Sequence, residues 1–244
     1  MQKTVFGHSL QNFRNYVDYT RQNQDIKEYV SSVYQKVLLG DIITRNKLRN
    51  ENAVKILIKK IAESVRNDIS YTKLHNTLKA IGISISKDSV IDYVGYAMDA
   101  YLIFSVQNFF TKFVDRESTA KYYFTDNGLL NLFLTDKNSS LLENVVAAEL
   151  AGRHPGGLYY LKSSQTGIDV DFYIENERTA IQVAYSIEGD AMDREVGNLV
   201  KLAHIFDAVD RFLIITKEEE TVIEKDSVKI EVLPSYKYLA LTAT

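Results

Sequence analysis

The chain has 244 residues, and its 45% hydrophobic content is enough to bury one or two domain cores. It contains no cysteine, which excludes disulfides and thiolate metal sites. Residues 1–128 hold 18 Lys and Arg against 13 Asp and Glu, whereas residues 129–244 hold 11 against 19. A basic half followed by an acidic half suggests two units, and the acidic half would repel nucleic acid unless metal ions intervened.

No apolar run approaches the length of a membrane-spanning helix, and the N-terminus lacks a signal-peptide core. We therefore expect a cytoplasmic protein with no membrane segment. The histidines have no ligand spacing, so a zinc site is not expected. They are His8, His75, His154 and His204.

Residues 1–49 are expected to form a helical linker region. Aromatic side chains near its start could dock a partner or pack on the chain's own helices; they include Phe6, Phe13, Tyr16 and Tyr19. From Asp25 the apolar spacing predicts a helix that breaks at Gly40. A second helical run follows through Ala53 and Ile61.

Residues 50–137 are expected to form a winged-helix domain. Ser70 and Ser86 are placed to cap two helices, with Gly82 in the turn between them. Two strand-like runs follow, 102–110 and 121–124, on either side of a charged loop at 115–118. Three helices followed by a hairpin is the element order of a winged helix.

The second of these capped helices is a weak candidate for reading DNA. A recognition helix presents basic or amide groups to the duplex. This helix offers Lys87 but also Asp88, Asp92 and Asp99, which oppose the phosphates. A structural or protein-docking role is therefore preferred, and nucleic-acid binding through Lys87 is kept as an alternative.

Residues 138–244 are expected to form an α/β domain. A helix over 141–152 places Glu149 in the middle of its apolar face and Glu143 at the edge. Strands, helices and a predicted solvated loop at Glu218–Glu220 follow. The predicted order is helix, three-strand meander, helix, strand, strand and terminal helix.

The centre of that domain is a predicted hairpin, residues 167–174 and 180–185. Period-two alternation places Asp169 and Asp171 on one face of its first strand, where buried carboxylates would need a partner or a metal. Gln182 and Ala184 share a face of its second strand.

A helix carrying Glu, a strand carrying Asp and a strand carrying Glu-x-Lys is the order of the PD-(D/E)XK nuclease fold. There, carboxylates bind Mg²⁺ and the metal activates a water. Asp171 stands in the Asp position, and Glu143 and Glu149 are the candidate helix ligands. Gln182 and Ala184, however, replace the Glu and the Lys.

The chain also resembles the C-terminal region of bacterial and archaeal AAA+ superfamily ATP-binding proteins, a region catalogued as a domain of unknown function. The stretches that carry the resemblance are residues 29–42, 121–129, 142–150, 169–172, 181–185 and 194–195. The resemblance implies a winged helix followed by a restriction-endonuclease-like domain. This chain is similar to the degenerate branch, which carries Gln-Val-Ala in place of Glu-Val-Lys.

No G-x-x-x-x-G-K-[ST] loop is present, so ATP hydrolysis does not carry over to this chain, and no cofactor is expected in it. We expect a non-catalytic regulatory or interaction region whose partner is a protein or an ATPase module. One alternative is a Mg²⁺-dependent nuclease that uses Asp171, Glu143 or Glu149, Asp169 and a displaced Lys162. The other is a winged-helix DNA-binding protein.

Overall fold

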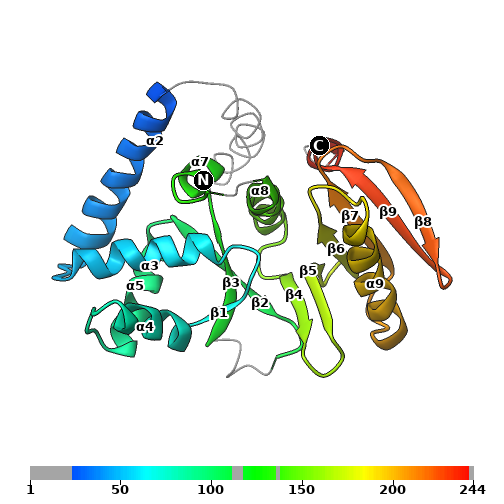
Figure 1. Ribbon diagram of the computed structural model, residues 1–244, viewed down its shortest axis with the longest axis horizontal. Coiled ribbons are helices and arrows are strands. Elements are labelled where there is room, and N and C mark those ends of the chain that lie inside the picture. Colours follow the sequence, from blue (N-terminus) through cyan, green and yellow to red (C-terminus); the bar gives the residue numbers. More distant parts are fainter. Residues whose placement is uncertain (1–23, 112–117, 136–137, 242–244) are drawn as a thin grey trace. The chain divides into compact units, whose positions relative to one another are not determined.

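The computed structural model describes residues 24–111, 118–135 and 138–241, which form two compact units. One unit comprises residues 24–106 and 118–135, and the other comprises residues 107–111 and 138–241. The mixed α/β composition confirms the predicted fold class (Figure 1). In the described ranges, no helix is both long and apolar enough to cross a membrane.

The first unit is built from helices and a small antiparallel sheet. Its elements are α2 (Gln24–Lys36), the π-helix η1 (Val37–Thr44), α3 (Glu51–Glu63), β1 (Ile69–Ser70), α4 (Tyr71–Ala80), α5 (Lys87–Asp99), β2 (Ile103–Asn108), β3 (Thr119–Phe124) and α7 (Asn127–Asn131). Strand β3 lies between β1 and β2 and is antiparallel to both.

The helix that begins this unit does not break at Gly40, so that prediction is wrong. Helix α2 runs directly into η1, and the Arg45 N–H donates to the Gly40 carbonyl with the five-residue spacing of a π-helix. Leu38 and Ile42 are fully buried on η1. Their burial offsets the cost of a helical glycine, which is about 1 kcal/mol relative to alanine.

The predicted capped helices are confirmed. The Ser70 hydroxyl accepts from the Lys73 N–H at 3.1 Å, and the Ser86 hydroxyl accepts from the Ser89 N–H at 3.0 Å. The two predicted strands appear as β2 and β3. The winged-helix affiliation stays a prediction. Most of the charged loop at 115–118 and the N-terminal aromatic residues lie outside the described ranges.

The second unit is a mixed sheet with helices packed on it. Its elements are α8 (Asn138–Arg153), β4 (Leu158–Ser163), β5 (Ile168–Ile174), β6 (Thr179–Val183), α9 (Asp190–Ile205), β7 (Arg211–Thr216), β8 (Thr221–Lys225), β9 (Val228–Pro234) and α10 (Ser235–Leu241). The strand order is β4-β5-β6-β7-β9-β8, and the last residues of β2 run parallel to β4. Strands β6, β7 and β9 are mutually parallel.

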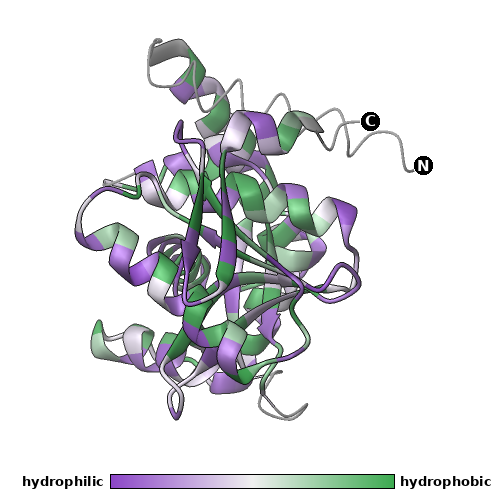
Figure 2. Ribbon diagram, turned by 90° about the vertical axis from the view of Figure 1, so that its right-hand side faces the viewer, coloured by the Kyte–Doolittle hydropathy of each residue, from purple (hydrophilic) through white to green (hydrophobic). Residues whose placement is uncertain are grey.

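The core of this unit lies between the sheet and α9. Val196 and Leu199 of α9 belong to one buried cluster with Val170 of β5 and Ile214 of β7. The helices carry both hydrophilic and hydrophobic bands along their ribbons, as expected of helices that bury one side (Figure 2).

Strand β8 was not predicted, and the solvated loop before it is only partly solvated. Glu218 and Glu220 are exposed, but the Glu219 carboxylate is half-buried and accepts from the Ile187 N–H at 3.2 Å. The sequence conceals β8 because four of its five residues are exposed, so no apolar period marks it.

Candidate functional site

The predicted hairpin is present as β5 and β6, with one aspartate on its outer surface and one half-buried. Val170 and Phe172 are fully buried, whereas Asp169 is exposed and Asp171 is half-buried, as the alternation predicts. The backbone register of β5 and β6 runs from Ile174↔Thr179 to Phe172↔Ile181. Beyond that point side chains continue the connection.

Gln182 makes the first of these connections with its amide. Its Oε1 accepts from the Asp171 N–H at 3.0 Å, and its Nε2 donates to the Asp169 carbonyl at 3.0 Å. The side chain is 2% exposed. The amide therefore takes the place of a neighbouring strand's backbone along two residues of β5.

The Asp171 side chain on β5 forms a hydrogen bond with the backbone of β6. Its Oδ2 accepts from the Val183 N–H of β6 at 3.0 Å. Asp171 also contributes to raising the pKa of Arg194 on α9, after the larger effect of the hydrogen bonds from Arg194 to Glu195. The Asp171 carboxylate is thus engaged with the backbone and lies in the field of a fixed cation.

The side-chain amide of Asn108 binds the backbone of β4 in a similar way. Its Nδ2 donates to the Lys162 carbonyl at 2.8 Å, and its Oδ1 accepts from the Lys162 N–H at 3.1 Å. The Lys162 ammonium lies 3.8 Å from the Asp169 carboxylate, in an exposed cross-strand ion pair. Lys162 is therefore held beside Asp169, the more exposed of the two aspartates.

The two helix carboxylates lie on α8 and are both buried. Glu149 pairs with Arg153 one turn later, where Nε donates to Oε1 at 2.7 Å and a terminal guanidinium nitrogen makes a second contact. Arg153 lies over the Tyr238 ring at 5.9 Å. Glu143 is fully buried. Glu149 therefore has a cation of its own within its helix.

These donors do not fit a Mg²⁺ site. Mg²⁺ needs oxygen ligands in near-octahedral geometry at about 2.1 Å. Oδ2 of Asp171 and Oε1 of Gln182 are both hydrogen-bonded to backbone N–H groups, and the Glu149 carboxylate is neutralised by Arg153. Throughout the part of the chain that the structure describes, no group of three or more His, Asp or Glu residues could hold a metal ion.

Ala184 offers no substitute for the missing lysine. It is 6% exposed and packs in the buried cluster with Ile187 and Val196. A lysine at this position would have to enter that cluster, where an ammonium would lose its hydration.

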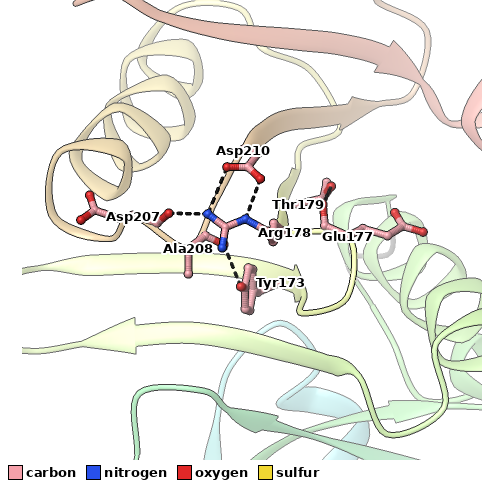
Figure 3. A network of polar contacts seen from close by, with 7 residues as sticks. All are labelled: Tyr173, Glu177, Arg178, Thr179, Asp207, Ala208 and Asp210. Carbon is pink, nitrogen blue, oxygen red and sulfur yellow. Dashed lines mark hydrogen bonds and ion pairs between the residues drawn. The ribbon is translucent and has the colours of Figure 1, made fainter.

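The opposite end of the hairpin is secured by Arg178 in the β5–β6 turn (Figure 3). Arg178 reaches the loop between α9 and β7, where it donates to the carboxylate of Asp210 and to the backbone carbonyl of Asp207. The Tyr173 hydroxyl donates to the Ala208 carbonyl of the same loop at 2.8 Å. Both ends of the hairpin are therefore held by polar side chains.

Three residues of this arrangement were missed by sequence reasoning: Asn108, Arg178 and Arg194. Arg194 had a signal, because it falls in one of the stretches on which the predicted resemblance to AAA+ proteins rests. Asn108 and Arg178 had none, since their contacts depend on chain segments 54 and 32 residues away.

A family model described as a domain of unknown function (DUF8612) matches residues 13–140. The chain belongs to this family. The match covers the first unit and ends close to the beginning of α8.

Two relatives extend the similarity over most of the chain. The uncharacterized protein MJ1544 of Methanocaldococcus jannaschii is 31% identical over 224 residues, which cover 87% of this chain and 49% of that protein. An uncharacterized protein of Haemophilus influenzae is 26% identical over 210 residues, covering 83% and 50% respectively. The chain thus spans about half the length of each of these relatives. No solved structure matches it.

Proposed function

We propose that this chain is a non-catalytic regulatory or interaction region that works with an AAA+ superfamily ATPase module. One observation carries the non-catalytic part. The amide of Gln182, in the position of a catalytic carboxylate, is used to hold the backbone of β5. An amide in this position carries no negative charge for a metal ion, and these two hydrogen bonds orient it toward the backbone of β5.

Two further features support the absence of nuclease chemistry. Ala184 carries no group that could orient a water or stabilise developing charge, and it is buried. Lys162, on the adjacent strand β4, forms an exposed ion pair with Asp169. The framework of a nuclease-like fold is proposed to remain as a scaffold.

The ATPase partner rests on the resemblance of six stretches between residues 29 and 195 to regions that accompany AAA+ modules. The relatives are about twice as long as the matched segment, which leaves room in them for such a module. The proposed role is to bind that module or to transmit a signal to or from it.

The first test is a cleavage assay with the purified chain on DNA and RNA in the presence of Mg²⁺ or Mn²⁺. We expect no cleavage above that of an Asp171→Ala preparation purified in parallel. Metal-dependent cleavage that disappears in Asp171→Ala would replace this proposal with the nuclease alternative.

The second test concerns the ATPase. We expect the whole Methanocaldococcus relative to hydrolyse ATP and its rate to change when the segment matched by this chain is removed. A relative with no ATPase activity, or with a rate that is indifferent to the removal, would contradict the proposed partnership.

A further inference from the structure

We infer that the Gln182 amide takes the place of a neighbouring strand's backbone. It holds the beginning of β5, at Asp169 and Asp171, in place without a metal ion. The inference rests on the non-catalytic part of the proposed function. It assigns Gln182 a positioning role that a glutamate, the residue of active nuclease sites, could not perform.

The chemistry of the two backbone groups requires an amide. The Asp171 N–H needs an acceptor and the Asp169 carbonyl needs a donor, and both lie 3.0 Å from the Gln182 side chain. An amide supplies one of each in a single planar group, whereas an ionised carboxylate supplies acceptors only, and one orientation of the amide matches. An ionised carboxylate would set an oxygen lone pair against the Asp169 carbonyl.

Burial makes that mismatch costly. Gln182 is 2% exposed, so water cannot enter to separate two opposed oxygens. A Gln182→Glu chain would therefore have to protonate the new carboxyl, displace β5 or bind a cation. The first response gives the variant a distinctive pH dependence.

Asn108 provides a second case in which a side-chain amide binds both a backbone N–H and a backbone carbonyl. Asn108 binds both backbone groups of Lys162 on β4, at 2.8 and 3.1 Å, and is 8% exposed. Two neighbouring strands, β4 and β5, thus have part of their backbone satisfied by a buried side-chain amide.

The charges around Asp171 complete the argument. Its Oδ2 is taken by the Val183 N–H, and it lies close enough to Arg194 to help raise the pKa of that guanidinium. A divalent cation at Asp171 would have to break the first contact and approach the second against its charge.

The test compares three isosteric variants of the intact chain by thermal unfolding. Gln182→Glu is expected to lower Tm by about 5 °C or more at about pH 8, because a buried donor–acceptor pair becomes two acceptors. The difference in Tm between Gln182→Glu and the natural chain should become smaller toward about pH 5, where a protonated glutamic acid regains a donor. Equal stability of Gln182→Glu and the natural chain at pH 8 would overturn the inference.

Asp171→Asn supplies the matched variant, because an asparagine Oδ1 can still accept from the Val183 N–H. Its Tm loss should be smaller than that of Gln182→Glu, because the backbone contact is kept while the charge near Arg194 is removed. Asp169→Asn is the control, since it keeps the backbone carbonyl that Gln182 uses. A Tm loss in Asp169→Asn as large as in Gln182→Glu would show that the aspartate charges, not the amide, hold the hairpin.

Calorimetric titration with MgCl₂ gives a readout that does not depend on Tm or on a partner. The natural chain should show no saturable heat up to about 10 mM, a range that covers weak Mg²⁺ sites. Saturable binding that is lost in Asp171→Asn would overturn the inference, and it does so even if Gln182→Glu does not fold. Failure of the ATPase partnership alone would leave these results unchanged.

Discussion

The guanidinium of Arg178 grips the carboxylate of Asp210 with two hydrogen bonds, from Nε to Oδ2 at 2.5 Å and from a terminal nitrogen to Oδ1 at 3.1 Å. A backbone hydrogen bond joins the same two residues, because the Asp210 N–H donates to the Arg178 carbonyl at 2.8 Å. The two residues are 32 positions apart in the chain. Together they tie the β5–β6 turn to the loop that precedes β7.

This pair should make stability depend on acid pH. The hydrogen bond from Arg178 lowers the pKa of Asp210 below its ordinary value of 3.8. A carboxyl whose pKa is lowered by folding stabilises the folded state above the unfolded pKa, and that contribution is lost as pH falls through the folded pKa. Asp210→Asn should therefore lower Tm at neutral pH, and the difference in Tm should shrink as the pH falls below the ordinary pKa of 3.8.

The measurement is thermal unfolding of both proteins between neutral pH and about pH 2. Asp207→Asn is the control, because Arg178 binds the backbone carbonyl of Asp207 and not its carboxylate. A deficit in Asp210→Asn that is constant across this range would mean that shape rather than charge matters at this position.

A tyrosine in the first unit should govern unfolding at high pH. Burial raises the pKa of Tyr34 to about 12 from its ordinary value of 10.0. A group whose pKa is raised by folding contributes stability below its unfolded pKa, and this contribution is lost as pH rises through the folded pKa. Stability should therefore decline between about pH 10 and 12, and less steeply in Tyr34→Phe.

Phenylalanine keeps the edge-to-face contact of Tyr34 with Phe133, whose ring centroids are 5.2 Å apart. Circular dichroism during an alkaline titration follows the transition. Tyr29→Phe serves as the comparison, since Tyr29 is 69% exposed. If both variants shift the transition equally, burial of Tyr34 is not the cause.

The contribution of the α4 N-cap to stability should be measurable by removing the hydroxyl oxygen of Ser70. Ser70→Ala removes the acceptor for the Lys73 N–H and should reduce the free energy of unfolding by about 1 kcal/mol. Ser70→Asp, which restores an acceptor, should recover most of the loss in chemical denaturation. A full-sized loss in Ser70→Asp would assign the effect to packing at the end of β1.

The exposed surface of α5 should not read DNA. Asp88, Asp92 and Asp99 are all exposed on this helix, against a single exposed lysine, Lys87. We expect no binding of duplex DNA in fluorescence anisotropy even at about 50 mM salt, where phosphate contacts are strongest. Binding that weakens in Lys87→Glu and falls steeply with salt would support the winged-helix alternative instead.

Local signals in the sequence were enough for much of the fold. Ser70 and Ser86 marked helix starts because a cap acts on residues three positions away, and the alternation around Asp171 marked β5. The π-helix at Gly40 was beyond such signals, since its backbone is held by the burial of Leu38 and Ile42 in tertiary packing.

The candidate site was predictable in its residues but not in their bonding. The sequence placed Asp169, Asp171 and Gln182 together and marked Gln182 as a departure from a metal ligand. It could not show that the amide spans the backbone of the opposite strand, because that depends on where the register of β5 and β6 ends. The partnership of Glu149 with Arg153 was available in principle from their spacing of four on a helix.

Strand β8 bears on how this protein behaves when it is concentrated. It forms the end of the strand order, and its outer edge carries backbone groups of the kind that recruit further strands. The strand is only five residues long, and its exposed Val222 is accompanied by exposed Glu224 and Lys225. Short length and charge are the means by which natural sheets resist joining edge to edge. Neutral apolar residues at positions 224 and 225 would remove that protection and leave an edge strand prone to pair with the edge of another molecule.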